Sequence, residues 1–409
     1  MKTALVLGGG GTRGAYEVGV IKALNELNVH IDIVTGTSIG ALIGALYVQG
    51  DFQKAYDFCA NMQASDITLD GISNDTTFEN FMEQKNKFPK IFKTYMQEKG
   101  ADITPLKENI NQMFDFDKFK NSPIDYGLTM TKFPNLERIE VYKEDMTKEY
   151  ATKQILASAA CFPAFPMVDI DGELYMDGGY SDNCPFDQAI RMQADYFIVV
   201  ELNVDNPVHT NLHYYPNVIY IRPTRPLGRI LSFNREQTLN NIELGYLDTM
   251  RAFKKYKGFT YTFKPDHSQP KYLTYLQKVN AALSLSRLYD ETNFLEVLCE
   301  PYPIKENIDF DYRICEILAD IMDLSQEYIY TISQMNDIFK DYYSSNDFQY
   351  KDLIKHLPFM NKDENKMYLV GCIYQQIKNS TSPFEDINLL GKVLPKETLC
   401  ALYLNLLLE

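Results

Sequence analysis

Short apolar runs alternate with helical patterns over the first fifty residues. The apolar run Thr3–Leu7 is followed by four glycines and then by Ala15–Leu27, in which apolar residues recur at helical spacing. A second apolar run, Ile31–Val34, ends at Gly36, and Ile39–Val48 has the pattern of a largely buried helix. This order of strand, turn and helix predicts an α/β fold, with a mainly parallel central sheet and helices on both faces.

The same pattern continues, with interruptions, to about residue 256. Further strand-like runs are Tyr126–Thr131, Ile139–Tyr142, Leu174–Met176, Asp195–Leu202 and Val218–Arg222. Two more helices are predicted over Thr152–Ala160 and Arg235–Tyr256. Between these elements, Ala64–Asn121 is helical in pattern but polar, and we interpret it as a helical insertion or lid.

No run beyond about Pro270 has the pattern of a strand. Apolar residues there recur at helical spacing, for example Ile314, Ile317, Leu318 and Ile321. With 409 residues, the chain is longer than one ordinary core requires. We therefore expect an α/β domain over 1–269, with the insertion at 64–121, and a helical region of unknown role over 270–409.

Composition limits the classes of partner. A hydrophobic content of 45% with 23% charged residues is typical of a folded chain. The formal net charge of −15 opposes binding to phosphate backbones and to anionic membrane surfaces, so nucleic acid is not an expected partner. Any contact with lipid is then expected to rely on apolar and aromatic side chains more than on charge. The sequence does not indicate an oligomeric state.

Seven cysteines are scattered along the chain without C-x-x-C spacing. This pattern argues against a disulfide framework and against a zinc site, and it favours a reducing compartment. The N-terminal apolar run ends at Leu7, which is too short for a signal-peptide core, and no apolar stretch approaches the length of a membrane span. We expect a cytoplasmic protein that meets a membrane only peripherally.

The first motif with chemical potential is the Gly-rich turn Gly9-Gly10-Gly11-Thr12-Arg13-Gly14, directly after a predicted strand. As G-x-G-x-x-G it could bind a dinucleotide, because glycines let the backbone approach a pyrophosphate. Alternatively, consecutive glycines can turn backbone N–H groups outward to bind an oxyanion. A tight strand-to-helix turn with no ligand is the third interpretation, and the motif alone does not separate the three.

The second motif, Gly36-Thr37-Ser38-Ile39-Gly40, also lies between a strand and a helix. It has the G-x-S-x-G pattern of a nucleophile elbow, whose sharp turn requires small residues two positions before and after the serine. Ser38 also lies at the N-terminus of the predicted helix, where the helix dipole favours developing negative charge. It also argues against the dinucleotide interpretation, because the elbow occupies the strand end where such a fold places its acidic residue.

The third motif is Asp177-Gly178-Gly179, which follows a short predicted strand. Taken alone it is most simply a turn, since Asp-Gly is among the commonest turn dipeptides. Its significance depends on the two motifs before it.

In this order and at this spacing, the three motifs resemble the patatin-like phospholipase family. The resemblance is specific, extends to the small-residue segment Ala157–Pro163, and covers about residues 3–225. One departure is Asp182, which replaces the first of two asparagines that the family often has after the D-G-G motif. This departure could alter local hydrogen bonding without changing the catalytic pair.

The resemblance implies a serine acyl hydrolase acting on lipid acyl esters, with Ser38 as nucleophile and Asp177 as its general base. It implies an oxyanion hole at Gly9, Gly10 and Gly11, with the N–H groups of Gly10 and Gly11 as donors. The remaining motif residues take supporting roles: Thr12, Arg13 and Gly14 in the oxyanion loop, Gly36, Thr37, Ile39 and Gly40 in the elbow, and Gly178 and Gly179 beside the base. For Arg13 we favour a role in ordering the loop over contact with a phosphate head group. No metal and no cofactor is implied.

Two kinds of alternative stay open. A Ser-Asp/Glu-His triad would need one of His209, His213, His267 or His356, and none of these lies in a motif. The same Ser-Asp pair could also serve an acyl transferase or a thioesterase, or the scaffold could be a non-catalytic lipid-binding protein. Retention of all three motifs argues against the non-catalytic alternative.

Overall fold

The computed structural model of the chain divides into two compact units, Met1–Ala252 and Phe253–Glu409. The structure describes residues 1–69, 101–203, 211–212, 215–265, 271–285, 294–299, 309–349 and 363–408. The division falls before the boundary expected at residue 269. The physical reason is that β9 (Thr262–Phe263) pairs with β10 (Ile329–Tyr330), which ties the segment after Ala252 to the second unit.

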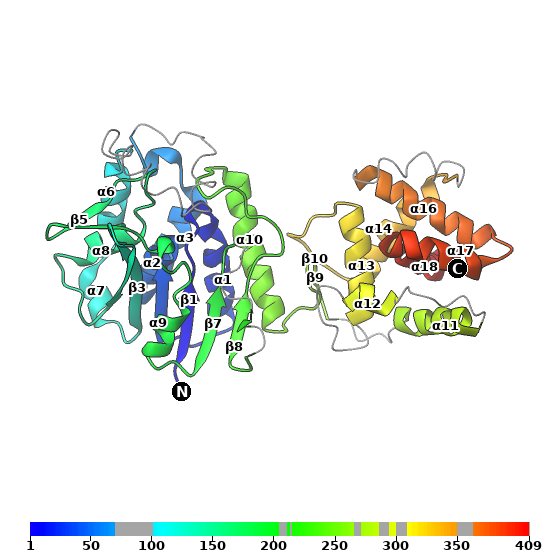
Figure 1. Cartoon of the computed structure of the whole chain (residues 1–409), viewed down its shortest axis with the longest axis horizontal. Helices are drawn as coiled ribbons and strands as arrows, with labels where there is room; N and C mark the ends of the chain where they lie inside the picture. Colours follow the sequence, from blue (N-terminus) through cyan, green and yellow to red (C-terminus); the bar gives the residue numbers. More distant parts are fainter. Residues whose placement is uncertain are drawn as a thin grey trace. The chain divides into compact units, whose positions relative to one another are not determined.

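The first unit is built around an eight-stranded sheet with the order β5-β6-β3-β2-β1-β7-β8, and β4 pairs with β3 (Figure 1). The strands are β1 (Thr3–Leu7), β2 (Ile33–Thr37), β3 (Asp125–Lys132), β4 (Glu137–Tyr142), β5 (Val168–Ile170), β6 (Glu173–Asp177), β7 (Tyr196–Val200) and β8 (Val218–Ile221). Strands β3, β2, β1, β7 and β8 are parallel to their neighbours in this series, whereas β4 and β6 run antiparallel to β3. The predicted α/β class with a mainly parallel sheet is confirmed.

Both faces of the central strands are buried, which explains why β1 is apolar from Ala4 to Leu7. Ala4 and Val6 belong to a buried cluster with residues of α9 (Phe186–Arg191). On the opposite face, α2 (Ile39–Val48) packs closely, because a Cβ added at Gly44 would lie 2.8 Å from Val34 Cγ1. The sheet is therefore covered by helices on both sides.

Two helices of the first unit cross at very short range. A Cβ at Gly19 of α1 (Ala15–Glu26) would lie 1.9 Å from the carbonyl oxygen of Ile242, on α10 (Arg235–Ala252). A Cβ at Gly245 of α10 would lie 2.0 Å from the carbonyl oxygen of Tyr16. The Tyr16 hydroxyl donates to Asp248 Oδ2 at 2.5 Å beside this crossing. The chain segments just before α1 and α10 are thereby held near each other.

The other helical segments of the first unit are α3 (Phe52–Asn61), η2 (Ala64–Asp66), α6 (Thr104–Met113), α7 (Phe116–Asn121), α8 (Ala151–Ser158) and the short η1 (Gly11–Gly14) and η4 (Gly178–Tyr180). The predicted insertion at 64–121 is helical where it is described. Residues 70–100 of it lie outside the described residues, and its role as a lid stays a prediction.

The second unit is mostly helical and has its own apolar core. Its helices are α11 (Tyr272–Leu285), α12 (Phe294–Cys299), α13 (Asp309–Ile321), α14 (Ile332–Ser345), α16 (Asp363–Asn379), α17 (Pro383–Val393) and α18 (Pro395–Leu408). The expectation that no strand follows residue 270 is wrong at β10, whose two residues are too few to show a periodic pattern. Within the described parts of both units, no helix is both long and apolar enough to cross a membrane.

Candidate active site

Ser38 occupies a sharp turn between β2 and α2. Its backbone has φ 56° and ψ −124°, a left-handed conformation that is uncommon for a residue with a side chain. A Cβ at Gly36 would lie 2.5 Å from the carbonyl oxygen of Gly40, and a Cβ at Gly40 would lie 2.7 Å from the carbonyl oxygens of Leu7 and Gly8. The two glycines thus let the backbone close tightly enough to present the serine hydroxyl.

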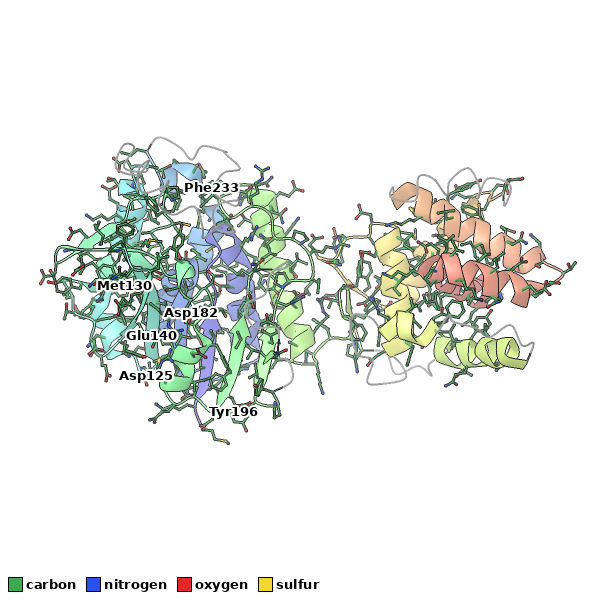
Figure 2. All side chains as sticks on the ribbon, in the orientation of Figure 1. Asp125, Met130, Glu140, Asp182, Tyr196 and Phe233 are labelled. Atoms are coloured by element: carbon green, nitrogen blue, oxygen red, sulfur yellow. The ribbon has the colours of Figure 1, made fainter. Side chains whose placement is uncertain are left out.

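Strand β3 brings Asp177 to Ser38. Thr37, the last residue of β2, pairs with Thr129, and Asp177, the last residue of β6, pairs with the next residue, Met130 (labelled in Figure 2). Because β4 occupies the other edge of β3, β2 and β6 lie along one edge and end facing each other. The Ser38 hydroxyl donates to Asp177 Oδ2 at 2.7 Å.

The carboxyl group of Asp177 is almost fully removed from water, with 3% of the residue exposed. Burial raises the pKa of Asp177 from its ordinary value to about 6. Two donors work in the opposite direction: the Gly179 N–H, which is 2.8 Å from Oδ1, and the Ser38 hydroxyl. The result is a carboxylate that is more basic than a solvated aspartate and that already accepts a hydrogen bond from the serine hydroxyl.

The Gly-rich turn lies against the serine, since a Cβ at Gly9 would be 3.1 Å from Ser38 Cβ. The Gly9 N–H donates to the Asn183 carbonyl at 2.9 Å, and Asn183 Nδ2 donates to the Gly9 carbonyl at 3.1 Å. The Gly9 N–H is therefore already hydrogen-bonded within the protein and is not free to donate to an oxyanion. Among the residues that the structure describes, the N–H groups of Gly10 and Gly11 have no such partner.

A second loop, residues 227–234, lies over the Gly-rich turn, and we call it the covering loop. The Thr12 N–H donates to the Ile230 carbonyl at 2.8 Å, and Arg13 Nε donates to the Gly228 carbonyl at 2.7 Å. Gly11 has φ 57°, and a Cβ there would lie 2.2 Å from the Ile230 carbonyl oxygen. Arg13 and Thr12 thus join the two loops, as an ordering role for Arg13 would require. The sequence gives no sign of this contact.

Ser38 and Asp177 open into a cavity of about 160 Å³. Part of its lining is apolar and comes from α2, α3 and α6 and the segments beside them, through Leu42, Phe58, Met62, Ile67, Leu106 and Ile110. The covering loop adds Ile230, Leu231 and Phe233, the last of which is labelled in Figure 2. Such a cavity suits an extended hydrocarbon chain better than a polar ligand.

Comparison with known proteins identifies this part of the chain. Residues 5–190 match the family model described as Patatin-like phospholipase. The chain carries a patatin-like phospholipase domain. The motif order from which the resemblance was inferred lies within the matched segment.

Curated relatives of the patatin-like domain include Lysophospholipase NTE1 of Mycosarcoma maydis, 30% identical over 212 residues, and Patatin-like phospholipase domain-containing protein 6 of Mus musculus, also 30% identical over 212 residues. The alignments cover 49% and 52% of this chain, but only 10% and 14% of those proteins. The chain therefore spans a small fraction of the length of these relatives. Among solved structures, it is similar to VipD from Legionella pneumophila, with a TM-score of 0.43, 14% identity, and coverage of 98% of this chain and 90% of that one.

Asp182, where the patatin-like domain departs from the family pattern, joins the elbow to the base motif. Its carbonyl accepts from Thr37 Oγ1 at 2.9 Å, and its carboxylate accepts from Arg138 at 2.9 Å. Close packing also fixes the neighbouring glycines, because a Cβ at Gly178 would lie 2.2 Å from the Thr129 carbonyl oxygen. The departure adds an ion pair and leaves the contact between serine and aspartate in place.

The histidines of the rival triad, His209, His213, His267 and His356, lie outside the described residues. The remaining histidine, His30, has a largely exposed side chain next to Asp32. Groups that could ligate a metal do not gather anywhere in the described ranges.

Sequence reasoning missed a role for Ser158, the last residue of α8. The Ser38 N–H donates to Ser158 Oγ at 3.0 Å, and the Ser158 hydroxyl donates in turn to the Thr129 carbonyl at 2.6 Å. Ser158 is fully buried. Ser158 therefore stabilises the strained turn at Ser38 in the patatin-like domain. The only sequence signal was its place in a segment of small residues.

Replacing Ser158 by Ala should lower the free energy of unfolding by about 1–3 kcal/mol, because the buried Ser38 N–H loses its acceptor. Chemical denaturation followed by circular dichroism measures this change. Ser122→Ala is the matched control: Ser122 Oγ also accepts a backbone N–H, from Ile124 at 3.3 Å, but in a less buried position. The control should change stability by less than about 0.5 kcal/mol. Equal effects of the two substitutions would contradict the supporting role.

Proposed function

We propose that the patatin-like domain is a serine acyl hydrolase that cleaves lipid acyl esters, as a phospholipase A or lysophospholipase does. The observation that carries the proposal is the 2.7 Å contact between the Ser38 hydroxyl and the Asp177 carboxylate, beside an apolar cavity. The names of the curated relatives point to the same substrate class.

In the first step, Ser38 Oγ attacks the ester carbonyl as its proton passes to Asp177 Oδ2. The tetrahedral intermediate collapses, the alcohol leaves with that proton, and an acyl-Ser38 ester forms. A water molecule then attacks the acyl-enzyme while Asp177 takes its proton, and the fatty acid is released as the proton returns to Ser38. Proton transfer from serine to a carboxylate is feasible because the pKa of Asp177 is raised towards 6.

The negative charge on the tetrahedral intermediate would be stabilised by the N–H groups of Gly10 and Gly11. A donor in an oxyanion hole contributes roughly 3–4 kcal/mol to the transition state. The covering loop fixes the Gly-rich turn through Thr12 and Arg13, so these donors need little reorganisation during the reaction. Burial of Ser38, of which 8% is exposed, strengthens the same interactions by excluding water.

Labelling with a fluorophosphonate probe tests the nucleophile. The native protein should be labelled, and Ser38→Ala should not, with the fold verified by circular dichroism. Release of free fatty acid, measured beside transfer of the acyl group to glycerol or lysolipid, separates a hydrolase from an acyl transferase. A native protein that is folded but unlabelled would favour a binding protein on this scaffold.

The rate should depend on pH through Asp177. The base must be ionised, so kcat/KM on a soluble ester should rise about tenfold per pH unit below pH 6 and level off above it. The physical reason is that burial moves the pKa of Asp177 upward to about 6. A midpoint near 4, the value of a solvated aspartate, would contradict the role of burial. Circular dichroism at each pH controls for acid unfolding.

A cytoplasmic location and a peripheral contact with the membrane stay predictions from the sequence. A lipid substrate would reach Ser38 from a bilayer or micelle through the apolar cavity.

A further inference from the structure

The covering loop belongs to a segment with an unusual charge composition. Residues 222–235 contain four arginines, Arg222, Arg225, Arg229 and Arg235, and no aspartate or glutamate. The chain as a whole carries 55 acidic against 40 basic residues, for a net charge of −15. A cationic segment on an acidic protein creates a local attraction for anions that the rest of the surface opposes.

This segment lies at the cavity. Ile230, Leu231 and Phe233 contribute to the cavity wall, and the backbone around them is fixed to the Gly-rich turn by the bonds from Thr12 and Arg13. Arg229 directly precedes the first of these cavity residues, and its carbonyl accepts from Thr12 Oγ1 at 3.2 Å. Arg229 is therefore held next to the cavity lining by its own main chain.

Two of the arginines are available to a ligand. The side chains of Arg229 and Arg235 are exposed, and neither makes a hydrogen bond or ion pair with the part of the chain that the structure describes. Arg13 also lines the cavity, but its guanidinium group is already engaged, because its Nε donates a hydrogen bond to the Gly228 carbonyl. Unpaired guanidinium groups are well suited to phosphate, which they can bind through two parallel hydrogen bonds.

The chemistry of the proposed substrate indicates where a phosphate would lie. In a glycerophospholipid, the phosphate and the scissile ester are attached to the same glycerol. With the ester carbonyl at Ser38 and the acyl chain along the apolar lining, the glycerol phosphate would extend away from that lining. The arginine-bearing segment reaches the same cavity through Ile230, Leu231 and Phe233.

We infer that Arg229 and Arg235 bind the phosphate of the lipid substrate, so that the enzyme prefers phosphorylated glycerolipids to neutral glycerides. This inference rests on the proposed function. It assigns a head-group preference to the same site, carried by residues that lie outside the three sequence motifs.

The test compares two substrates with the same acyl chain, lysophosphatidic acid and monoacylglycerol, both below their critical micelle concentrations. Monomeric substrates remove any contribution from binding to a lipid surface. For the native protein, KM should be lower for lysophosphatidic acid. In Arg229→Gln/Arg235→Gln, KM for this substrate should rise about tenfold with kcat nearly unchanged, while KM for monoacylglycerol should stay the same.

Two further variants serve as controls. Arg229→Lys keeps the charge and should retain most of the affinity that Arg229→Gln loses. Lys2→Gln removes one positive charge from an exposed side chain directly before β1, at the opposite end of that strand from the Gly-rich turn, and should leave both KM values unchanged. These controls separate phosphate binding from a change in net charge.

Equal changes in KM for both substrates, or no change for lysophosphatidic acid, would overturn the inference and leave the proposed function intact. An effect of the arginine variants on binding to anionic vesicles, without a change in KM for the monomer, would also overturn it in favour of surface docking. Failure of the native protein to hydrolyse either substrate or a soluble ester in a Ser38-dependent manner would overturn the proposed function itself, and the inference with it.

Discussion

Asp177→Asn should lower kcat by about 10⁴-fold and, at the same time, make the folded protein more stable at pH 8. The loss of activity follows from removal of the base, since an amide cannot accept the serine proton, and comparable substitutions in serine hydrolases have effects of this size. Asparagine can keep both local hydrogen bonds, with Oδ1 accepting from Gly179 and Nδ2 facing Ser38 Oγ. The two readouts should therefore move in opposite directions.

The gain in stability has a defined pH range. The pKa of Asp177 in the folded protein, about 6, lies above its ordinary value of 3.8, so ionisation is less favourable in the folded state. Well below pH 3.8 the group is protonated in both states, and its ionisation then has no effect on stability. As pH rises from 4 to 6, ionisation of the buried carboxyl increasingly lowers the free energy of unfolding. Above pH 6 this loss of stability reaches its full size, on the order of 1–3 kcal/mol.

Denaturant titrations at pH 4, 6 and 8 measure this difference. The gain in stability of Asp177→Asn relative to the native protein should be small at pH 4 and reach its full size at pH 8. Asp187→Asn, at a carboxylate that is 57% exposed, should show no such pH dependence. A variant that is destabilised at every pH would mean that the carboxylate is needed for folding and is not a costly catalytic group.

Gly11→Ala should lower kcat by about 10²–10³-fold with the overall fold retained. The new methyl group would lie 2.2 Å from the Ile230 carbonyl oxygen, so the Gly-rich turn and the covering loop must separate. This movement would misalign the N–H groups of Gly10 and Gly11 with the oxyanion, and loss of one such donor costs a factor of this size.

Gly50→Ala is the matched control for Gly11→Ala. Gly50 also has a left-handed backbone, with φ 85°, but nothing lies within 4 Å of a Cβ placed there. Both substitutions carry a similar backbone strain of about 1 kcal/mol, visible in thermal unfolding. Only the first should reduce turnover of a soluble ester, and equal turnover in the two variants would argue against the proposed oxyanion donors.

The sequence allowed the first half of the sheet to be predicted well, because buried parallel strands and their helices have strong patterns. Thr3–Leu7 and Ile39–Val48 were predicted with the boundaries that the structure has. The short strand Val168–Ile170 and the helix Phe186–Arg191 were not predicted, since three to six residues are too few for a period to appear.

The candidate site was predictable only where it consists of local motifs. Gly36 and Gly40 are recognisable because the sharp turn imposes their spacing on the chain. The contact of Thr12 with Ile230 joins residues 218 positions apart, and no local pattern encodes it. The same is true of Ser158, which supports Ser38 through a single hydroxyl group.

Consecutive residues of β3, Thr129 and Met130, pair with the strand ends that carry the serine and the aspartate. The distance between these two groups is thus set by a main-chain ladder, supported by Ser158 of α8, and the other segments joining the strands are not part of that ladder. A protein engineer could exchange those connecting segments to accept bulkier or shorter acyl chains. A single-residue insertion between Thr129 and Met130 of β3, by contrast, would shift Asp177 relative to Ser38, whichever residue is inserted.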